Sequence, residues 1–293
     1  MHASAIAGGG GAVSLIRMIT LGVRAHDFGK LPIEQMAETV AAHGFSSIQL
    51  ALAKALDGIC TDTGSYSPGL ARRVRHAFAS RGVSIAVLGC YINPIDPDPT
   101  SRRQQMERFK EHLRFARDFG CSVVATETGS RNADWSFHPD NTTDATLSEL
   151  TSQIGELVAV AEKAGVFVCI EGVTRHVVST PARMKRVLDA VRSPNLQVLF
   201  DPVNLLDAKN HATQVAIMDE AFSLFGDRIQ IIHAKDFAVD GGALKPALLG
   251  EGSLRLDVLL KHLKRKSYID VLLEETAPAT VDRCVQNLKR ALG

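Results

Sequence analysis

The chain has 293 residues, of which 45% are hydrophobic and 22% charged, and its formal net charge is +1. This length suits one large domain and is close to the ~250 residues typical of an eight-fold β/α barrel. A net charge near zero provides no basic field to neutralise the phosphates of a nucleic acid. No apolar stretch approaches the ~18–20 residues that cross a bilayer. We therefore expect neither nucleic acid nor membrane as a partner.

The two ends of the chain differ in composition. Residues 1–17 are rich in Ala, Ser and Gly, contain four consecutive glycines and lack the long apolar core of a signal peptide. We interpret them as a disordered extension or a cloning remnant, and expect one folded domain over residues 18–293. The five cysteines are dispersed and form no CxxC pair, which favours a reducing, cytoplasmic location over a disulfide framework.

Short β-rich runs alternate with longer amphipathic segments, eight of each. The runs are residues 20–23, 47–50, 84–88, 122–126, 166–170, 197–200, 229–232 and 270–273. The predicted helices are residues 33–43, 69–81, 102–119, 144–164, 180–191, 214–225, 254–264 and 280–292. This alternation predicts βαβ units and a parallel sheet. Eight units without a break in composition favour a single-domain (β/α)8 TIM barrel, and no GxGxxG follows the first strand to indicate a dinucleotide fold.

Several helices carry start and stop signals in the sequence. Thr180-Pro181 supplies a helix N-cap and a proline at the first helical position, and Ser253 precedes the next-to-last helix in the same way. Four glycines follow predicted helix ends, where a left-handed residue is favoured: Gly44, Gly82, Gly120 and Gly165.

Four acidic or imidazole residues directly follow four consecutive apolar runs in the second half of the chain. They are Glu171, Asp201, His233 and Glu274. In a barrel the carboxyl ends of the strands share one rim, where the active site lies. Buried charges at one rim are costly unless a partner compensates them, and one divalent cation can serve all four. The mixed oxygen and nitrogen set suits Mn²⁺ first, then Mg²⁺ or Co²⁺, with Zn²⁺ as a further choice. Glu275 is the alternative to Glu274 as the fourth ligand.

These residues and their neighbours resemble the xylose isomerase-like TIM barrels, in particular the sugar phosphate isomerase and epimerase group. The segments that carry the resemblance are residues 22–29, 48–52, 170–172, 200–204, 233–236, 249–252 and 273–275. The resemblance implies one divalent metal bound by Glu171, Asp201, His233 and Glu274. It also implies a homo-dimer or homo-tetramer. Ketose epimerases of this family carry His where this chain has Asn204, and an Arg shortly after the strand-seven His where this chain has Lys235-Asp236-Phe237.

Sugar isomerases and epimerases share one hard step, the loss of a weakly acidic proton beside a carbonyl. A metal stabilises the resulting ene-diolate, and two acid–base groups move the proton. We assign Glu171 and Glu274 as this catalytic pair. The alternative is a metal-dependent dehydratase, a lyase of an inosose-like ketone. An endonuclease-like phosphodiesterase of the same fold would need several more histidines at strand ends.

Further polar residues at predicted strand ends are candidates for binding a small carbohydrate substrate. They are His26, Asn93, Glu127, His176, Asn204, Lys235 and Glu251. Lys235 is the most favoured, because it follows a predicted metal ligand by two residues; a salt bridge to Asp236 is its structural alternative. For the others, a cap, turn or supporting role competes with substrate binding. Trp135 lies in the long loop after the fourth strand, as a substrate wall or as packing on the rim.

Overall fold

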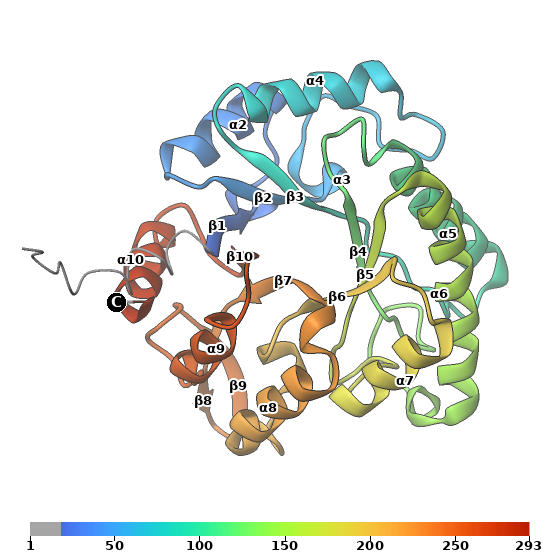
Figure 1. Ribbon diagram of the computed structural model, residues 1–293, viewed down its shortest axis with the longest axis vertical. Helices are drawn as coiled ribbons and strands as arrows, with labels where there is room; N and C mark the ends of the chain where they lie inside the picture. Colours follow the sequence, from blue (N-terminus) through green and yellow to red (C-terminus); the bar gives the residue numbers. More distant parts are fainter. Residues whose placement is uncertain (1–18, 293) are drawn as a thin grey trace, which may run out of the picture.

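A closed parallel barrel forms the centre of the computed structural model, which describes residues 19–292 (Figure 1). The predicted extension, residues 1–17, lies outside the described residues. The barrel order is β1-β10-β7-β6-β5-β4-β3-β2. Its strands are β1 (Ile19–Arg24), β2 (Ser47–Leu50), β3 (Ser84–Gly89), β4 (Val123–Glu127), β5 (Phe167–Glu171), β6 (Leu196–Phe200), β7 (Ile229–Ala234) and β10 (Ile269–Leu273). The predicted (β/α)8 barrel is confirmed.

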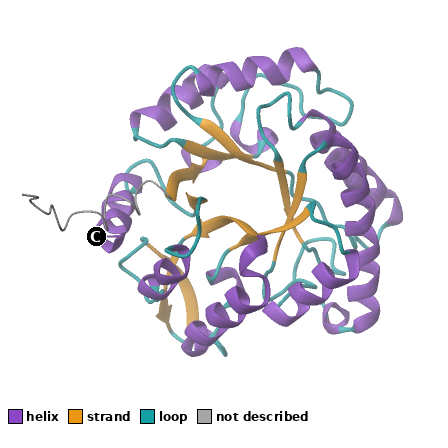
Figure 2. Ribbon diagram, viewed as in Figure 1, coloured by secondary structure: helices purple, strands orange, loops and turns teal. Residues whose placement is uncertain are grey.

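Helices surround the barrel and cover the outer face of its strands (Figure 2). They are α2 (Ile33–Ala42), α3 (Leu52–Ala55), α4 (Pro68–Ala79), α5 (Pro99–Phe115), α6 (Asp144–Ala164), α7 (Pro181–Val191), α8 (Gln214–Phe225), α9 (Leu256–Leu263) and α10 (Val281–Leu292). Short 3₁₀ turns join them: η1 (Ala25–Phe28), η2 (Pro139–Thr142), η3 (Val203–Leu205), η4 (His211–Thr213) and η5 (Gly226–Arg228). None of the helices within residues 19–292 is long and apolar enough to cross a membrane.

Most predicted boundaries agree with the structure to within a few residues, and the exceptions have local causes. Thr180 caps α7 as predicted, and all four predicted C-terminal glycines have positive φ, from 66° to 75°. Helix α5 starts three residues earlier than predicted, because Asp98 accepts a hydrogen bond from the amide of Thr100 and Pro99 occupies the first turn. Ser253 does not cap α9, which begins at Leu256.

An antiparallel hairpin after β7 has no counterpart in the sequence prediction. Strands β8 (Asp236–Asp240) and β9 (Ala243–Ala247) pair outside the barrel, beside α8 and α9 in Figure 1. The turn between them uses Gly241 and Gly242, both at positive φ. The hairpin is short and its outer half is exposed, so it lacks the alternating apolar pattern that reveals a half-buried strand.

The close approach of β1 to β2 at Gly22 predicts that no larger residue fits there. A Cβ on Gly22 would lie 2.4 Å from the carbonyl oxygen of Ser47, a backbone atom of β2 that cannot rotate away. We expect Gly22→Ala to lower the free energy of unfolding by about 2–4 kcal/mol, measured by urea denaturation. The control is Gly155→Ala in α6, where a Cβ meets nothing within 4 Å. This variant should gain up to about 1 kcal/mol, because alanine is the better helix former. Equal effects of the two changes would contradict the steric argument.

Candidate metal centre

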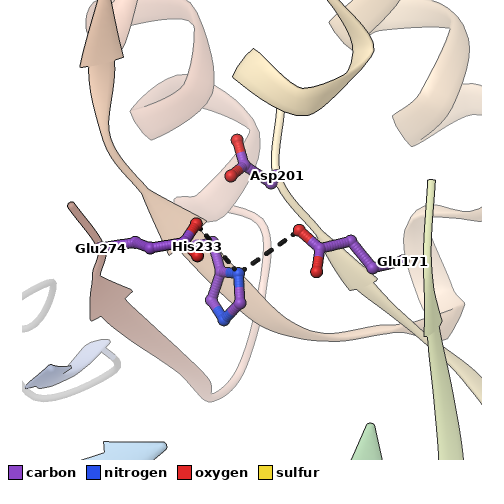
Figure 3. Close-up of side chains that lie close together, drawn as sticks. All are labelled: Glu171, Asp201, His233 and Glu274. Carbon is purple, nitrogen blue, oxygen red and sulfur yellow. Dashed lines mark ion pairs between the residues drawn. The ribbon is translucent and has the colours of Figure 1, made fainter. Parts of the chain in front are cut away.

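Four side chains from four adjacent strands converge at the C-terminal rim of the barrel (Figure 3). Glu171 ends β5, Asp201 follows β6, His233 lies near the end of β7, and Glu274 follows β10. One ligand atom of each lies within 4.8 Å of those of the other three. All four residues are buried, with exposed fractions from 1% to 8%. The structure thus brings together the four residues that were predicted to bind a metal.

The hydrogen bonds of His233 leave one ring nitrogen available for an ion. Its Nε2 lies 2.5 Å from Oε1 of Gln49, an oxygen that can only accept, so Nε2 carries the proton. In the neutral ring that metal binding requires, Nδ1 is then the lone-pair nitrogen. It lies 3.4 Å from Glu171 Oε1 and 3.5 Å from Glu274 Oε2 (Figure 3), and has no hydrogen-bond partner among the described residues. A buried, unsatisfied imidazole nitrogen facing two carboxylates is the arrangement of a metal-binding histidine.

Strong electrostatic coupling marks the cluster. Burial raises the pKa of Asp201 to about 7, although the charge of Lys235 opposes this. Burial disfavours a charged His233, but the carboxylates of Glu274 and Glu171 raise its pKa to about 9. Burial alone would raise the pKa of Glu274, yet the positive charges of His233, Lys235 and Arg24 hold this pKa well below its ordinary value. Three buried carboxylates and one imidazole therefore fit a hard or borderline divalent ion of the Mn²⁺, Mg²⁺, Co²⁺ and Zn²⁺ group.

Lys235 and Asn204 lie inside the same cluster. The ammonium of Lys235 is 3.0 Å from Asp201 Oδ2, 3.2 Å from Glu274 Oε2 and 2.8 Å from Asn204 Oδ1. Asn204 in turn donates from Nδ2 to Glu171 Oε1 at 2.8 Å. These two predicted substrate-binding residues thus contact three of the four candidate ligands. The alternative pairing of Lys235 with the adjacent aspartate does not form.

Glu274 and Glu275, the two alternatives for the fourth ligand, both follow β10, which ends at Leu273. The backbone turns into the left-handed region at Glu275, where φ is 55°. Oε1 of Glu275 lies 3.2 Å from Nζ of Lys235, at the outer edge of the cluster. Only Glu274 joins the group whose ligand atoms converge.

Asp236 organises the loop after β9. Its carboxylate accepts hydrogen bonds from four backbone amides, those of Phe237, Gly250, Gly252 and Leu254, at 2.8–3.1 Å. The loop amides point inward, and the side chain of Glu251 points outward. Glu251 contacts Arg283 and Asn287 of α10 instead of the metal cluster. The structure therefore places this predicted substrate-binding residue away from the site.

The partly exposed Glu127 and the buried His176 form a second pair beside the cluster. Glu127 is the register partner of Glu171 across β4 and β5, and its Oε2 lies 3.1 Å from Nδ1 of His176. Burial, followed by the charge of Glu171, raises the pKa of Glu127 to about 7. Burial lowers the pKa of His176 to about 3, so its ring is neutral. Trp135 packs edge-on against His176 at 5.5 Å between ring centroids, as a wall beside this pair.

The other two predicted contacts lie at different depths. His26 is half-buried near Tyr91, with 6.5 Å between ring centroids, and burial lowers its pKa to about 3. Asn93 is fully buried, and its amide bonds the carbonyl and amide of Ser130, so it joins two rim loops.

Arg24 contacts the cluster but was not among the residues predicted from the sequence. It ends β1, and its guanidinium pairs with Asp27 and Glu274. The criterion that found the four ligands, a charged residue ending an apolar run, also applies to it.

A family model described as xylose isomerase-like TIM barrel matches residues 37–290. The chain belongs to this family. No curated protein sequence matches it significantly.

Several solved structures share the whole barrel. A 3-keto-D-glucoside 4-epimerase from E. coli superimposes with a TM-score of 0.67 at 15% identity, covering 93% of this chain and 99% of that chain. The IOLI protein with a bound zinc atom superimposes with a TM-score of 0.70 at 17% identity, covering 94% of this chain and 96% of that chain. The probable 3-DHS dehydratase from Bacillus anthracis superimposes with a TM-score of 0.66 at 13% identity, covering 90% of this chain and 98% of that chain. Identities this low establish the shared fold alone.

The contact between Gln49 and His233 predicts that Gln49 supports metal binding in this xylose isomerase-like barrel. Gln49→Leu removes the oxygen that keeps the imidazole proton on Nε2. It also removes the hydrogen bond that directs Nδ1 toward the carboxylates. We expect Mn²⁺ affinity, measured by calorimetry, to fall about 10–100-fold. The control is Gln230→Leu, an exposed glutamine on β7, which should bind Mn²⁺ like the wild type. Unchanged affinity in Gln49→Leu would show that the hydrogen bond does not orient the ring.

Proposed function

We propose that the protein is a divalent-metal-dependent isomerase or epimerase of a sugar, a sugar phosphate or a related polyol ketone. The observation that carries the proposal is the convergence of Glu171, Asp201, His233 and Glu274 at the C-terminal rim. Membership of the xylose isomerase-like family supports it, as does the fold shared with a sugar epimerase. Mn²⁺ is our first choice of ion, with Mg²⁺, Co²⁺ and Zn²⁺ as alternatives.

Glu171, Asp201, His233 and Glu274 would hold the ion, which would supply Lewis-acid stabilisation of the negative charge that develops on the substrate oxygens. Glu171 and Glu274 approach His233 from two sides (Figure 3), so their carboxylates would flank a substrate. One carboxylate removes the proton beside the carbonyl, and the other group returns it. Return to the opposite face of the same carbon inverts that centre. Return to the adjacent carbon interconverts an aldose and a ketose.

Lys235 and Asn204 take the positions from which substrate oxygens would be held. The ammonium of Lys235 keeps its proton, because burial is outweighed by the carboxylates of Asp201, Glu274 and Glu275, which raise its pKa. This same feature favours a second candidate function, the dehydration of an inosose-like ketone. After the first proton is removed, Lys235 would donate a proton to the departing β-hydroxyl, which leaves as water.

The proposed partners follow from the same site. We propose a small carbohydrate as the substrate, without nucleic acid, and a homo-dimer or homo-tetramer as the assembly. An endonuclease-like activity is disfavoured, because His233 is the one histidine in the converging cluster of the described residues and the net charge is only +1.

Deuterium wash-in tests the enolisation step. The Mn²⁺-loaded protein is incubated in D₂O with ketoses, aldoses, their phosphates and inososes, and carbon-bound deuterium is measured by NMR. We expect exchange with at least one compound, because isomerase, epimerase and dehydratase all begin with proton removal beside a carbonyl. Glu171→Gln and Glu274→Gln should reduce its rate at least ~10³-fold, since general acid–base groups contribute about that much. The products distinguish the isomerase from the dehydratase.

Glu275→Gln is the matched control for the wash-in experiment. It changes the neighbouring carboxylate, which contacts Lys235 at the edge of the cluster but is not a predicted ligand. We expect it to keep most of the exchange rate and of the Mn²⁺ affinity. Loss of exchange in Glu275→Gln but not in Glu274→Gln would reverse the assignment of the two glutamates. No exchange over the whole panel would contradict the proposed chemistry.

A further inference from the structure

A cavity of about 220 Å³ lies on the same rim as the metal cluster, beyond the ends of β2 and β3. It is open to solvent on one side and bounded by α3, the loop that follows it and one face of α5. Its polar lining consists of Lys54, Thr61, Asp62, Tyr66, Tyr91, Arg108 and His112. Pockets for whole small-molecule ligands measure roughly 300–1,000 Å³. This cavity is therefore of a size to hold one group of a ligand that extends beyond it.

The inner wall of the cavity is neutral and satisfied. Nδ1 of His112 lies 2.8 Å from the carbonyl oxygen of Arg108, so it carries the ring proton. Nε2 then accepts from the hydroxyl of Tyr66 at 3.2 Å. Burial lowers the pKa of His112 to about 4, so the ring adds no charge near neutral pH. These groups shape the cavity and do not compensate a charge within it.

Two cations of the lining have no carboxylate partner. Nζ of Lys54 lies over the ring of Tyr91, 4.1 Å from its centroid, and Nη2 of Arg108 donates to the carbonyl oxygen of Tyr91 at 2.6 Å. Among the described residues, neither has a carboxylate oxygen within 4 Å, although exposed Asp62 also lines the cavity. Lys110, one half-turn further along α5, pairs with two glutamates at 2.6 Å. Positive charge at the cavity is thus left available.

Tyr91 connects the cavity to the candidate metal centre. Its ring forms part of the cavity wall, and its hydroxyl contacts Nε2 of Gln49. Oε1 of the same Gln49 accepts from His233. Two side chains, Tyr91 and Gln49, therefore separate the cavity from a candidate metal ligand. The cavity therefore borders the candidate metal centre along the rim, on the side of β2 and β3.

We propose that this cavity is an oxyanion subsite, in which Lys54 and Arg108 bind the phosphate or carboxylate group of an acidic sugar derivative. The inference rests on the proposed function, because the rest of the substrate is assigned to the metal centre. The subsite makes a sugar phosphate or a sugar acid, rather than a neutral sugar, the substrate class. An oxyanion with two cationic donors forms charge-assisted hydrogen bonds, which are about twice as strong as neutral ones.

Binding of unreactive analogues tests the subsite apart from turnover. Calorimetry of the Mn²⁺-loaded protein compares five- and six-carbon alditols with their terminal phosphates and with the aldonates of the same length. We expect a phosphate or an aldonate to bind at least about tenfold more tightly than its neutral alditol. The phosphate and aldonate arms show which oxyanion is preferred. Equal affinities, or no binding by any charged analogue, would overturn the subsite.

Variants then locate the preference. Lys54→Met and Arg108→Met should each reduce the preference for the charged analogue about tenfold, while Arg108→Lys should retain most of it. The matched controls are Lys30→Met and Arg103→Met, exposed cations outside the cavity lining, which should keep the full preference. A preference that survives in Lys54→Met and Arg108→Met would overturn the assignment. Selective binding without deuterium exchange would support the subsite and contradict the enolisation. Deuterium exchange at equal kcat/KM for neutral and charged sugars would support the enolisation and contradict the subsite.

Discussion

The burial of three carboxylates around one imidazole is the constraint on which the rim of this barrel depends. An ionised carboxylate taken out of water costs several kcal/mol unless charges or hydrogen bonds compensate it. Here the compensation comes from other strands and loops. Lys235 follows β7, Arg24 ends β1, and the amide of Asn204 comes from the turn after β6. Lys235 is buried, Arg24 and Asn204 are partly buried, and each of the three contacts a candidate ligand.

The closed parallel barrel makes this concentration of charge possible. Parallel strands that close on themselves bring all their carboxyl ends to one rim, so residues 30–40 positions apart in the chain become neighbours. The loops that follow the strands must then be fixed so that they leave this rim open. Asp236 does this with four backbone amides, and Gly252 allows the approach, since a Cβ there would lie 2.3 Å from the Asp236 carboxylate. The same loop geometry turns Glu251 toward α10.

The sequence predicted the barrel and the four converging residues, because both depend on simple patterns. Apolar runs alternate with amphipathic segments, and a charged residue at the end of such a run is conspicuous. Contacts that depend on barrel closure could not be predicted. Arg24 reaches Glu274 because β1 pairs with β10, although the two residues lie far apart in the chain. Gln49 of β2 reaches His233 of β7 although β1 and β10 lie between their strands in the barrel. The β2 register also shifts between Ile48 and Gln49, a local irregularity with no sequence signal. For Glu251 and Asn93 the error is the opposite one. Both were predicted to bind substrate, but Glu251 contacts α10 and Asn93 joins two rim loops.

Lys235 limits what kind of metal site this can be. A divalent ion drawn to the oxygens of Asp201 and Glu274 meets an ammonium already 3.0 Å and 3.2 Å from them, and like charges at this distance weaken the binding of the ion. The same ammonium is held by Asn204, which also donates to Glu171, so its position is tied to two ligands and a third residue. A proton donor fixed this firmly beside the cluster is useful to a reaction that moves protons or expels a hydroxyl. It would be a disadvantage at a site that only stores a metal. The position of Lys235 beside the candidate ligands therefore favours the proposed catalytic role over a structural metal site.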